Sequence, residues 1–306
     1  MSDNRAQWQQ LVTELNERQA RAEAMGGEDK VAKHHAKGRL TARERMALLF
    51  DTGTFNEVGA LAGGNHPAGE PPLAGDGVVG GTGQVQGQTV VAIAEDFTVK
   101  GGSIGHVNAA KRARVVRLSL EQNLPLVIML EGAGERVGNS LERYPNTPND
   151  LQLVADLKGR VPVVTLVMGV SAGHGALTGV FADFIVMLED AALFTAGPPL
   201  VFASLGVQCT PQQLGSARVH ATESGVVHNL APTEEDAVAQ ARYFLSMTAS
   251  RNEAGLREQA AAKKYPVDAL LDIIPPEGEK AYDVRDVLHG IADENSLFQL
   301  QPEFGS

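Results

Sequence analysis

The stretch best suited to chemistry runs from Val161 to Gly179 and has the sequence VPVVTLVMGVSAGHGALTG. It begins with a β-branched apolar run typical of a buried strand, and then turns through small residues into a segment typical of a helix start. Backbone N–H groups at such a turn suit an oxygen that gains negative charge during a reaction. A tight turn that uses glycine only for packing has the same pattern, so both interpretations stay open.

His174 lies in this turn and has the side chain most often used as a general base. No Ser/His/Asp or Cys/His arrangement is evident around it, and Ser171 is not part of a GxSxG motif. A histidine in a turn often serves only packing. We therefore interpret the backbone amide of His174, and not its imidazole ring, as the chemically useful group.

A second candidate is the loop at 96–105, DFTVKGGSIG, which lies between a predicted strand and a basic helix. Its Gly101, Gly102 and Ser103 could form a phosphate-binding turn, with Lys111 on the helix as a cationic partner. The loop is not a P-loop, because GxxxxGK[ST] is absent. The cations of the helix could equally be surface charges.

A third candidate is the loop at 131–136, EGAGER, which follows the next predicted strand. Gly134 permits a ligand to approach the backbone closely, and Arg136 could position an anionic group. The alternative is a strand-to-helix turn with a structural salt bridge.

The chain offers little for a disulfide or a metal. Cys209 is the single cysteine, which excludes an internal disulfide and a zinc site built from several cysteines. His220 and His228 lack the neighbouring carboxylates that a metal site would need, so structural hydrogen bonds are expected for them. We predict no metal in this chain.

The composition is that of a globular protein. The net charge of the 306 residues is −11, which argues against general nucleic-acid binding. The basic stretch at 30–39 is interpreted as a solvated face or a partner contact. The polar N-terminus has no cleavable signal and the apolar runs are too short to cross a membrane, so a cytoplasmic protein without membrane contact is expected.

Apolar runs and helical patterns alternate along the chain, which predicts an α/β fold. Strands are predicted at 77–84, 89–96, 124–130, 161–168, 184–188 and 192–194, the first two as a hairpin. Helices are predicted at 4–25, 41–50, 107–122, 147–158 and 234–247. The last predicted elements are a helix at 282–292 and a strand that begins at 297.

Taken together, these pieces resemble the carboxyltransferase β subunit of biotin-dependent acyl-CoA carboxylases of the propionyl-CoA and acetyl-CoA type. Each piece is weak alone, but their order and spacing are specific. They run from GRLTARER at residue 38 through DGVV at 76, DFTV at 96, GGS at 101, Lys111, GER at 134, Ala172 with Gly173, GP at 197 and QLG at 213 to His220, Ser224, Gly225 and His228.

The resemblance implies a crotonase-like (ClpP-type) spiral of ββα units with an N-terminal helical extension. The expected segments are the extension at 1–40, the crotonase-like domain at 41–280, and the start of a truncated second unit at 281–306. The chain then corresponds to the N-terminal half of the usual subunit. In that family the active site lies between the N half of one protomer and the C half of another, within a hexameric ring.

The resemblance further implies transfer of carboxylate from carboxybiotin to the α-carbon of an acyl-CoA. By alignment, the amides of Gly173 and His174, next to Ala172, would hold the thioester enolate. The residues implied for binding the acyl-CoA are Gly101, Gly102, Ser103, Lys111, Gly134, Arg136 and Ala172. The partners implied are a biotin carboxyl carrier with its biotin carboxylase subunit, the C-terminal carboxyltransferase half and, at full length, further copies of the chain.

Three departures from the family pattern stand out. The family's usual Gly-Gly pair has His174 at its second position, the loop at 131–136 is EGAGER, and Ser216 replaces a common glycine. These changes suggest an unusual acyl group or a divergent branch. A decarboxylase that runs the same enolate chemistry backwards, and a non-catalytic half that binds CoA esters or assembles with a partner, are the alternatives.

Overall fold

The computed structural model describes residues 2–63, 73–136, 150–248, 268–293 and 296–305. The chain divides into two units, one formed by Met1–Met247 with Gln301–Ser306 and the other by Thr248–Leu300. This division differs from the predicted boundaries after residues 40 and 280. The helices before residue 41 belong to the same unit as the sheet.

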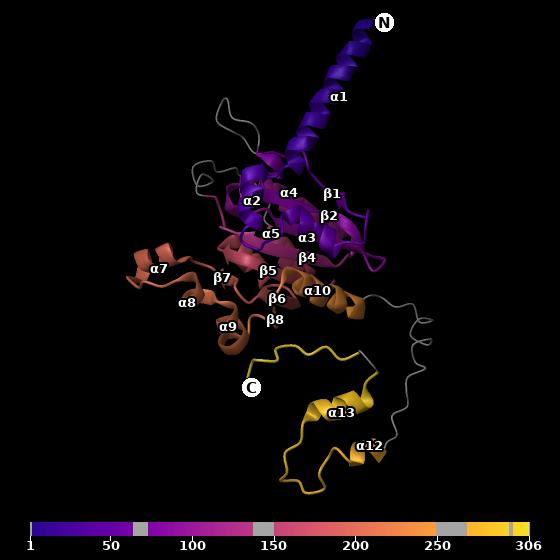
Figure 1. The fold of residues 1–306 in the computed structure, drawn as a ribbon, viewed down its shortest axis with the longest axis vertical. Helices are drawn as coiled ribbons and strands as arrows, with labels where there is room; N and C mark the ends of the chain where they lie inside the picture. The colour runs from indigo at the N-terminus through magenta and orange to yellow at the C-terminus, as the bar shows by residue number, and fades with distance from the viewer. Residues whose placement is uncertain (1, 64–72, 137–149, 249–267, 294–295, 306) are drawn as a thin grey trace. The chain divides into compact units, whose positions relative to one another are not determined.

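One mixed sheet organises the first unit (Figure 1). Its strands are β1 (Asn56–Glu57), β2 (Val78–Val85), β3 (Gln88–Glu95), β4 (Leu126–Gly132), β5 (Val163–Ala172), β6 (Phe184–Leu188), β7 (Ala192–Phe194) and β8 (Asn229–Ala231). Their order is β1-β2-β3-β4-β5-β6-β8, and β7 pairs with the end of β5. The pairs from β1 to β3 are antiparallel and those from β3 onward are parallel, as crossover helices require.

The helices lie between and after these strands. They are α1 (Ser2–Glu23), α2 (Glu28–His35), α3 (Ala42–Leu49), α4 (His106–Gln122), α5 (Asp150–Leu157), α6 (His174–Gly179), α7 (Pro198–Leu205), α8 (Pro211–Gly215), α9 (Ala217–Val219), α10 (Glu234–Thr248), α12 (Asp268–Leu271) and α13 (Val284–Ile291). Short helical turns cover Ala74–Gly77, Lys100–Gly102 and His220–Ser224. The alternation of strands and helices confirms the predicted α/β fold.

The predicted hairpin is the β2–β3 pair. Its two turn residues, Gln86 and Gly87, both have positive φ, as the type I′ turn that matches strand twist requires. The Asp51 carboxylate accepts hydrogen bonds from the N–H groups of both turn residues at 3.1 and 3.0 Å. The turn is therefore fixed by local conformation and by one side chain from the segment after α3.

The core lies on both faces of the sheet. All residues of β4 are buried, which explains its near-continuous apolar sequence. A methyl group at Gly80 would meet Val115 of α4, and one at Gly83 would meet Phe50 after α3. Because these two strand positions point to opposite faces, α4 and α3 cover opposite sides of the hairpin.

Helix α3 begins with a capping box formed by Thr41 and Glu44. The Thr41 hydroxyl accepts from the Glu44 N–H at 3.3 Å, and the Glu44 carboxylate accepts from the Thr41 N–H at 2.7 Å. Two N–H groups without helical partners are thereby satisfied. This fixes the entry of α3, which carries the buried Arg45.

Replacing Thr41 with alanine should lower the free energy of unfolding by about 1 kcal/mol, because it removes the cap acceptor. Urea denaturation followed by circular dichroism measures the change. Thr13→Ala, at an exposed position inside α1, is the matched control and should change stability by less than about 0.5 kcal/mol. Equal losses in both variants would contradict a specific capping role.

The C-terminal part follows the prediction only in its helix. Helix α13 lies within the predicted 282–292 segment, and the Asp283 side chain caps its first turn. The predicted strand from 297 is wrong, since Leu297–Leu300 has no regular structure. Further on, the Gln301 N–H donates to the His228 carbonyl oxygen at 2.9 Å.

Candidate functional site

The central stretch forms the predicted strand, turn and helix. Strand β5 continues to Ala172, beyond the predicted end at 168, and Gly173 follows with a φ of 62° before α6 begins at His174. That left-handed conformation is readily available to glycine. The turn is therefore one residue long, and the first helical N–H belongs to His174.

The two amides expected to act as a pair have different surroundings. The Gly173 N–H donates to the Phe194 carbonyl oxygen at 3.1 Å, because β7 pairs with the last residues of β5. The expectation that Gly173 offers a free donor is thus corrected. Within the part of the chain that the structure describes, the His174 N–H donates to no protein atom.

The loop at 131–136 lies directly against this turn. A methyl group at Gly134 would lie 2.9 Å from the Ala172 carbonyl oxygen and 3.5 Å from the Gly173 Cα. The Gly134 carbonyl accepts from the Ile104 N–H at 2.8 Å, while its own N–H has no acceptor among the described residues. Gly134 therefore takes the place of Gly173 as the second candidate donor.

The segment that contains Gly101 and Gly102 also lies against the loop at 131–136. The Gly101 carbonyl accepts from the Ala133 N–H at 3.0 Å. A methyl group at Gly102 would lie 2.5 Å from the Glu131 carbonyl oxygen. The structure thus brings together three segments that are distant in sequence, and their glycines allow the close contact.

The position of Lys111 differs from the one expected from the sequence. Its side chain is only 3% exposed, and its ammonium group donates to the Val78 carbonyl at 2.7 Å and to the Glu57 carboxylate at 3.3 Å. Burial lowers the pKa of Lys111, and the charge of Glu57 offsets part of that effect. The structure therefore gives this lysine a buried ion pair instead of a place beside Gly101.

Arg136 joins two loops of the protein. Its guanidinium pairs with the buried Asp76 carboxylate at 2.9 Å and donates to the Ser103 carbonyl at 2.9 Å and to the Ser103 hydroxyl at 3.2 Å. Ser103 is itself buried. These contacts match the alternative of a structural salt bridge, so Arg136 and Ser103 position the loops around the glycine segments.

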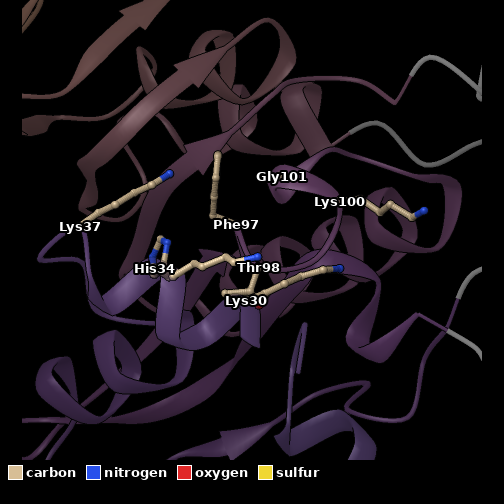
Figure 2. A pocket seen from close by; sticks show the side chains of 8 residues that line it. Lys30, His34, Lys37, Phe97, Thr98, Lys100 and Gly101 are labelled. Atoms are coloured by element: carbon tan, nitrogen blue, oxygen red, sulfur yellow. The ribbon is translucent and has the colours of Figure 1, made fainter. Parts of the chain in front are cut away.

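The cations that lie beside Gly101 come from α2, from the segment just after it and from Lys100 (Figure 2). A cavity of about 320 Å³, called here the lysine pocket, is lined by Lys30, Lys33, His34, Lys37, Phe97, Thr98, Lys100 and Gly101. All four lysines are exposed, and the Lys37 ammonium lies 5.8 Å from the Phe97 ring centroid. The sequence alone indicates a solvated face or a partner contact for the basic stretch at 30–39. Its position next to Gly101 makes it a candidate anion site.

A chain of buried charges leads to the turn. The Arg112 guanidinium pairs with Glu95 at 3.0 Å and with Asp150 at 2.6 Å, and Asp150 lies 2.6 Å from His174 Nε2. Burial raises the pKa of Glu95, against the charge of Arg112. The sequence shows no catalytic arrangement around His174, and the structure adds an acidic partner for its ring, Asp150, from a separate helix, α5.

A second buried cluster lies next to the first. The Arg45 guanidinium pairs with Glu131 at 2.6 Å and with Glu234 at 2.6 Å. The His34 Nε2 of the lysine pocket lies 3.5 Å from the Glu131 carboxylate. Side chains from α2, α3, β4 and α10 thus meet at the end of the strand that carries the glycine loop.

Several glycines of the site leave room for these carboxylates. A methyl group at Gly175 would lie 2.7 Å from a Glu95 oxygen, and one at Gly132 would lie 2.7 Å from the other. A methyl group at Gly169 would lie within 2.8 Å of the Glu131 carboxyl carbon. At these positions the glycines make room for buried carboxylates, while Gly173 and Gly134 face each other across the turn.

Gly175→Ala should lower the free energy of unfolding by about 1–3 kcal/mol, because the added methyl group would crowd the Glu95 carboxylate, which is buried and held by Arg112 and by the Glu131 N–H. Gly278→Ala is the control, since a methyl group there would meet no atom within 4 Å. Urea unfolding of both variants measures the difference. A Gly175→Ala protein as stable as the control would show that the turn relaxes freely.

No helix in the described part of the chain is long and apolar enough to cross a membrane. The same residues contain no group of three or more histidine, cysteine, aspartate or glutamate side chains arranged for a metal ion.

The sequence profile of the carboxyl transferase domain matches residues 33–306. The chain is 35% identical over 299 residues to the carboxyltransferase subunit of propionyl-CoA carboxylase from Haloferax mediterranei, covering 96% of this chain and 58% of that protein. It is 32% identical over 304 residues to the alpha subunit of methylmalonyl-CoA decarboxylase from Veillonella parvula, covering 97% and 60%. The chain thus spans about three-fifths of the length of these relatives.

Among solved structures, transcarboxylase 12S with methylmalonyl-CoA and methylmalonic acid bound is similar, with a TM-score of 0.86 and 29% identity. The alignment covers 97% of this chain and 59% of that one. A single-chain, multi-domain long-chain acyl-CoA carboxylase has a TM-score of 0.83 at 30% identity, over 96% of this chain and 30% of that one. These likenesses confirm the predicted crotonase-like fold.

Proposed function

The chain belongs to the carboxyl transferase domain family, and from this we propose that it is the acyl-CoA-binding half of a biotin-dependent acyl-CoA carboxyltransferase. One observation carries the proposal. The segments around Gly101, Gly134 and Gly173 lie against one another, and the lysine pocket adjoins the first of them. A CoA thioester has phosphates at one end, which suit the lysine pocket, and a reacting carbonyl at the other, which suits the glycine segments.

In the proposed site, the thioester oxygen accepts hydrogen bonds from the N–H groups of His174 and Gly134. These hydrogen bonds become stronger as the α-carbon loses its proton and negative charge moves onto the oxygen. The fixed backbone supplies them without reorganisation, since Arg136 and the buried charge chain hold the surrounding loops. The chain's own contribution is therefore stabilisation of the enolate and orientation of the acyl group.

Biotin is proposed to arrive on a separate carrier protein. In the family reaction it supplies the carboxylate that the enolate takes up. The donors described above are already assigned to the thioester oxygen, so the described residues do not also fit a biotin ring. We assign that ring to the C-terminal half of the subunit and derive no step through it.

The lysine pocket is proposed to hold the phosphates of CoA. Changing Lys33 and Lys100 together to glutamine should weaken binding of propionyl-CoA roughly 10-fold or more, because charge-assisted hydrogen bonds are lost. Isothermal titration calorimetry at low salt measures the change.

Two controls make this test specific. Propionyl-pantetheine has no phosphates, so its binding should be equal in the double variant and in the unchanged chain. Lys158→Gln removes a lysine that pairs with Asp183 away from the pocket and should leave CoA binding unchanged. A double variant that binds both ligands equally less well would indicate a general structural defect.

The proposed function is tested with two substitutions at one residue. His174→Pro removes the N–H at the first helical position, where proline is well tolerated, while His174→Gly keeps the N–H and removes only the ring. Propionyl-CoA should bind roughly 5–10-fold more weakly to the proline variant than to the glycine variant. Free CoA should bind both equally, and equal thioester affinities would overturn the proposed donor.

The 32% identity to a methylmalonyl-CoA decarboxylase subunit favours one further candidate, in which the same site stabilises the enolate left by decarboxylation. Incubation of methylmalonyl-CoA with the chain, the carrier and the C-terminal half distinguishes carboxylation from decarboxylation.

A non-catalytic CoA-ester-binding half is the third candidate. Assembly with a biotin carboxyl carrier, a biotin carboxylase subunit and further copies of the chain is part of the proposal, and the cytoplasmic location stays a prediction.

A further inference from the structure

One nitrogen of the His174 ring makes a hydrogen bond, and the other has no hydrogen-bond partner among the described residues. Its Nε2 lies 2.6 Å from an oxygen of the buried Asp150. Nδ1 makes no hydrogen bond to any residue that the structure describes, and the side chain is 29% exposed. A ring used only for packing would not need a buried charged partner together with an open edge.

The surroundings of Asp150 keep it ionised. Burial favours its neutral form, but the charge of Arg112 and the hydrogen bond from His174 outweigh burial and lower its pKa well below the usual range. The charged groups that face the ring come from α5 (Asp150), from α4 behind it (Arg112) and from β3 (Glu95). An ionised Asp150 favours the tautomer with hydrogen on Nε2, which leaves a lone pair on Nδ1.

We propose that His174 removes and returns the α-proton of a bound acyl-CoA, with Asp150 as its positioning residue. This activity needs no biotin, and it rests on the proposed function because it needs the acyl-CoA site. The backbone N–H of the same residue is assigned to the thioester oxygen. The α-carbon is two bonds from that oxygen, so one residue serves both ends of the reacting group.

The step is balanced within the protein and its substrate. The α C–H bond breaks, its electron pair becomes the carbon–carbon π bond of the enolate, the carbonyl π pair moves onto the thioester oxygen, and the proton goes to Nδ1 of the neutral imidazole. The Asp150 carboxylate stabilises the resulting imidazolium. When the ring exchanges its proton with water, the reverse step returns a solvent hydrogen to the α-carbon.

The test is hydrogen exchange in deuterium oxide. Propionyl-CoA is incubated with the full chain without biotin or carrier, and loss of the α-protons is followed by NMR. His174→Gln should lower the exchange rate by about 100-fold or more, within the range of general acid–base catalysis. Thioester binding, measured by calorimetry, should be retained because the backbone N–H remains.

Two further variants separate chemistry from structure. Asp150→Asn should also slow exchange strongly, because an amide no longer favours the reactive tautomer. His289→Gln, at an exposed histidine of α13 in the second unit, should leave the rate unchanged. Added imidazole should partly restore exchange to His174→Gly, which a merely structural role for the ring would not produce.

The outcomes are distinguishable. Binding of propionyl-CoA with exchange that depends on His174 supports the inference. Binding with no exchange, or with equal rates in the unchanged chain and His174→Gln, overturns the inference and leaves the proposed function standing. No binding by the folded, unchanged chain overturns both together.

Discussion

Replacing Arg112 with methionine should lower the free energy of unfolding by about 3–5 kcal/mol. The guanidinium is buried between the carboxylates of Glu95 and Asp150, at 3.0 and 2.6 Å. Its removal leaves two carboxylates buried without a counter-charge. Methionine is similar in length and helix propensity, so the loss reports mainly the missing charge.

Urea denaturation at neutral pH measures this loss. Arg114→Met on the exposed side of the same helix is the control and should change stability by less than about 0.5 kcal/mol. The triple variant with Glu95→Gln and Asp150→Asn should recover part of the stability, because neutral amides cost less to bury. A triple variant less stable than Arg112→Met alone would contradict this explanation.

The Arg112→Met defect should also grow as the pH rises. Burial already raises the pKa of Glu95, and removal of Arg112 removes the largest opposing cause. The folded variant then binds more protons than the unfolded chain between the unfolded and the folded pKa of this group. Stability therefore falls as the pH rises through that window. Unfolding measured from about pH 5 to pH 8 checks the sign, and a defect that shrinks over this range would contradict it.

Arg45→Met should be as destabilising, by about 3–5 kcal/mol. Its buried guanidinium binds Glu131 and Glu234, so the change removes the guanidinium from two buried carboxylates and weakens the contact between α3, β4 and α10. Arg39→Met is the matched control, since the Asp190 carboxylate that Arg39 pairs with is 71% exposed and stays in contact with water when the arginine is removed. A surface pair contributes about 1 kcal/mol or less.

Urea unfolding measures the loss of stability in Arg45→Met and in Arg39→Met.

Arg45→Met should also weaken CoA binding, because His34 of the lysine pocket lies next to Glu131. If Arg45→Met and Arg39→Met lose the same stability, the buried cluster is not an important support of the fold.

The fold was largely predictable because its signals are local. The buried strands are short β-branched runs, the hairpin has glycine at a turn that needs positive φ, and Thr41 with Glu44 forms a four-residue cap motif. The strand wrongly predicted from 297 shows the limit of such signals. A strand also needs a neighbouring strand, and its sequence cannot supply one.

The site was less predictable because its contacts join distant residues. Nothing local shows that β7 takes up the Gly173 N–H, or that Lys111 and Arg112 face the interior while Arg114 on the same basic helix faces solvent. The Asp150–His174 pair joins two helices and has no motif. The lysine pocket could have been found by pairing the basic stretch with the GGS loop, since each was noted separately.

The contact between Gly175 and Glu95 has a consequence for how this turn can vary. The Cβ atom of any side chain at position 175 would meet the Glu95 carboxylate. The same carboxylate restricts the size of the residue at position 132. A larger residue at Gly175 is therefore accommodated only together with a smaller residue at position 95, whereas Gly132 is also limited by the Gly102 carbonyl oxygen, 2.7 Å from an added methyl group. Laboratory evolution of the turn should diversify positions 95 and 175 together, because libraries that change Gly175 alone would return mostly unstable clones.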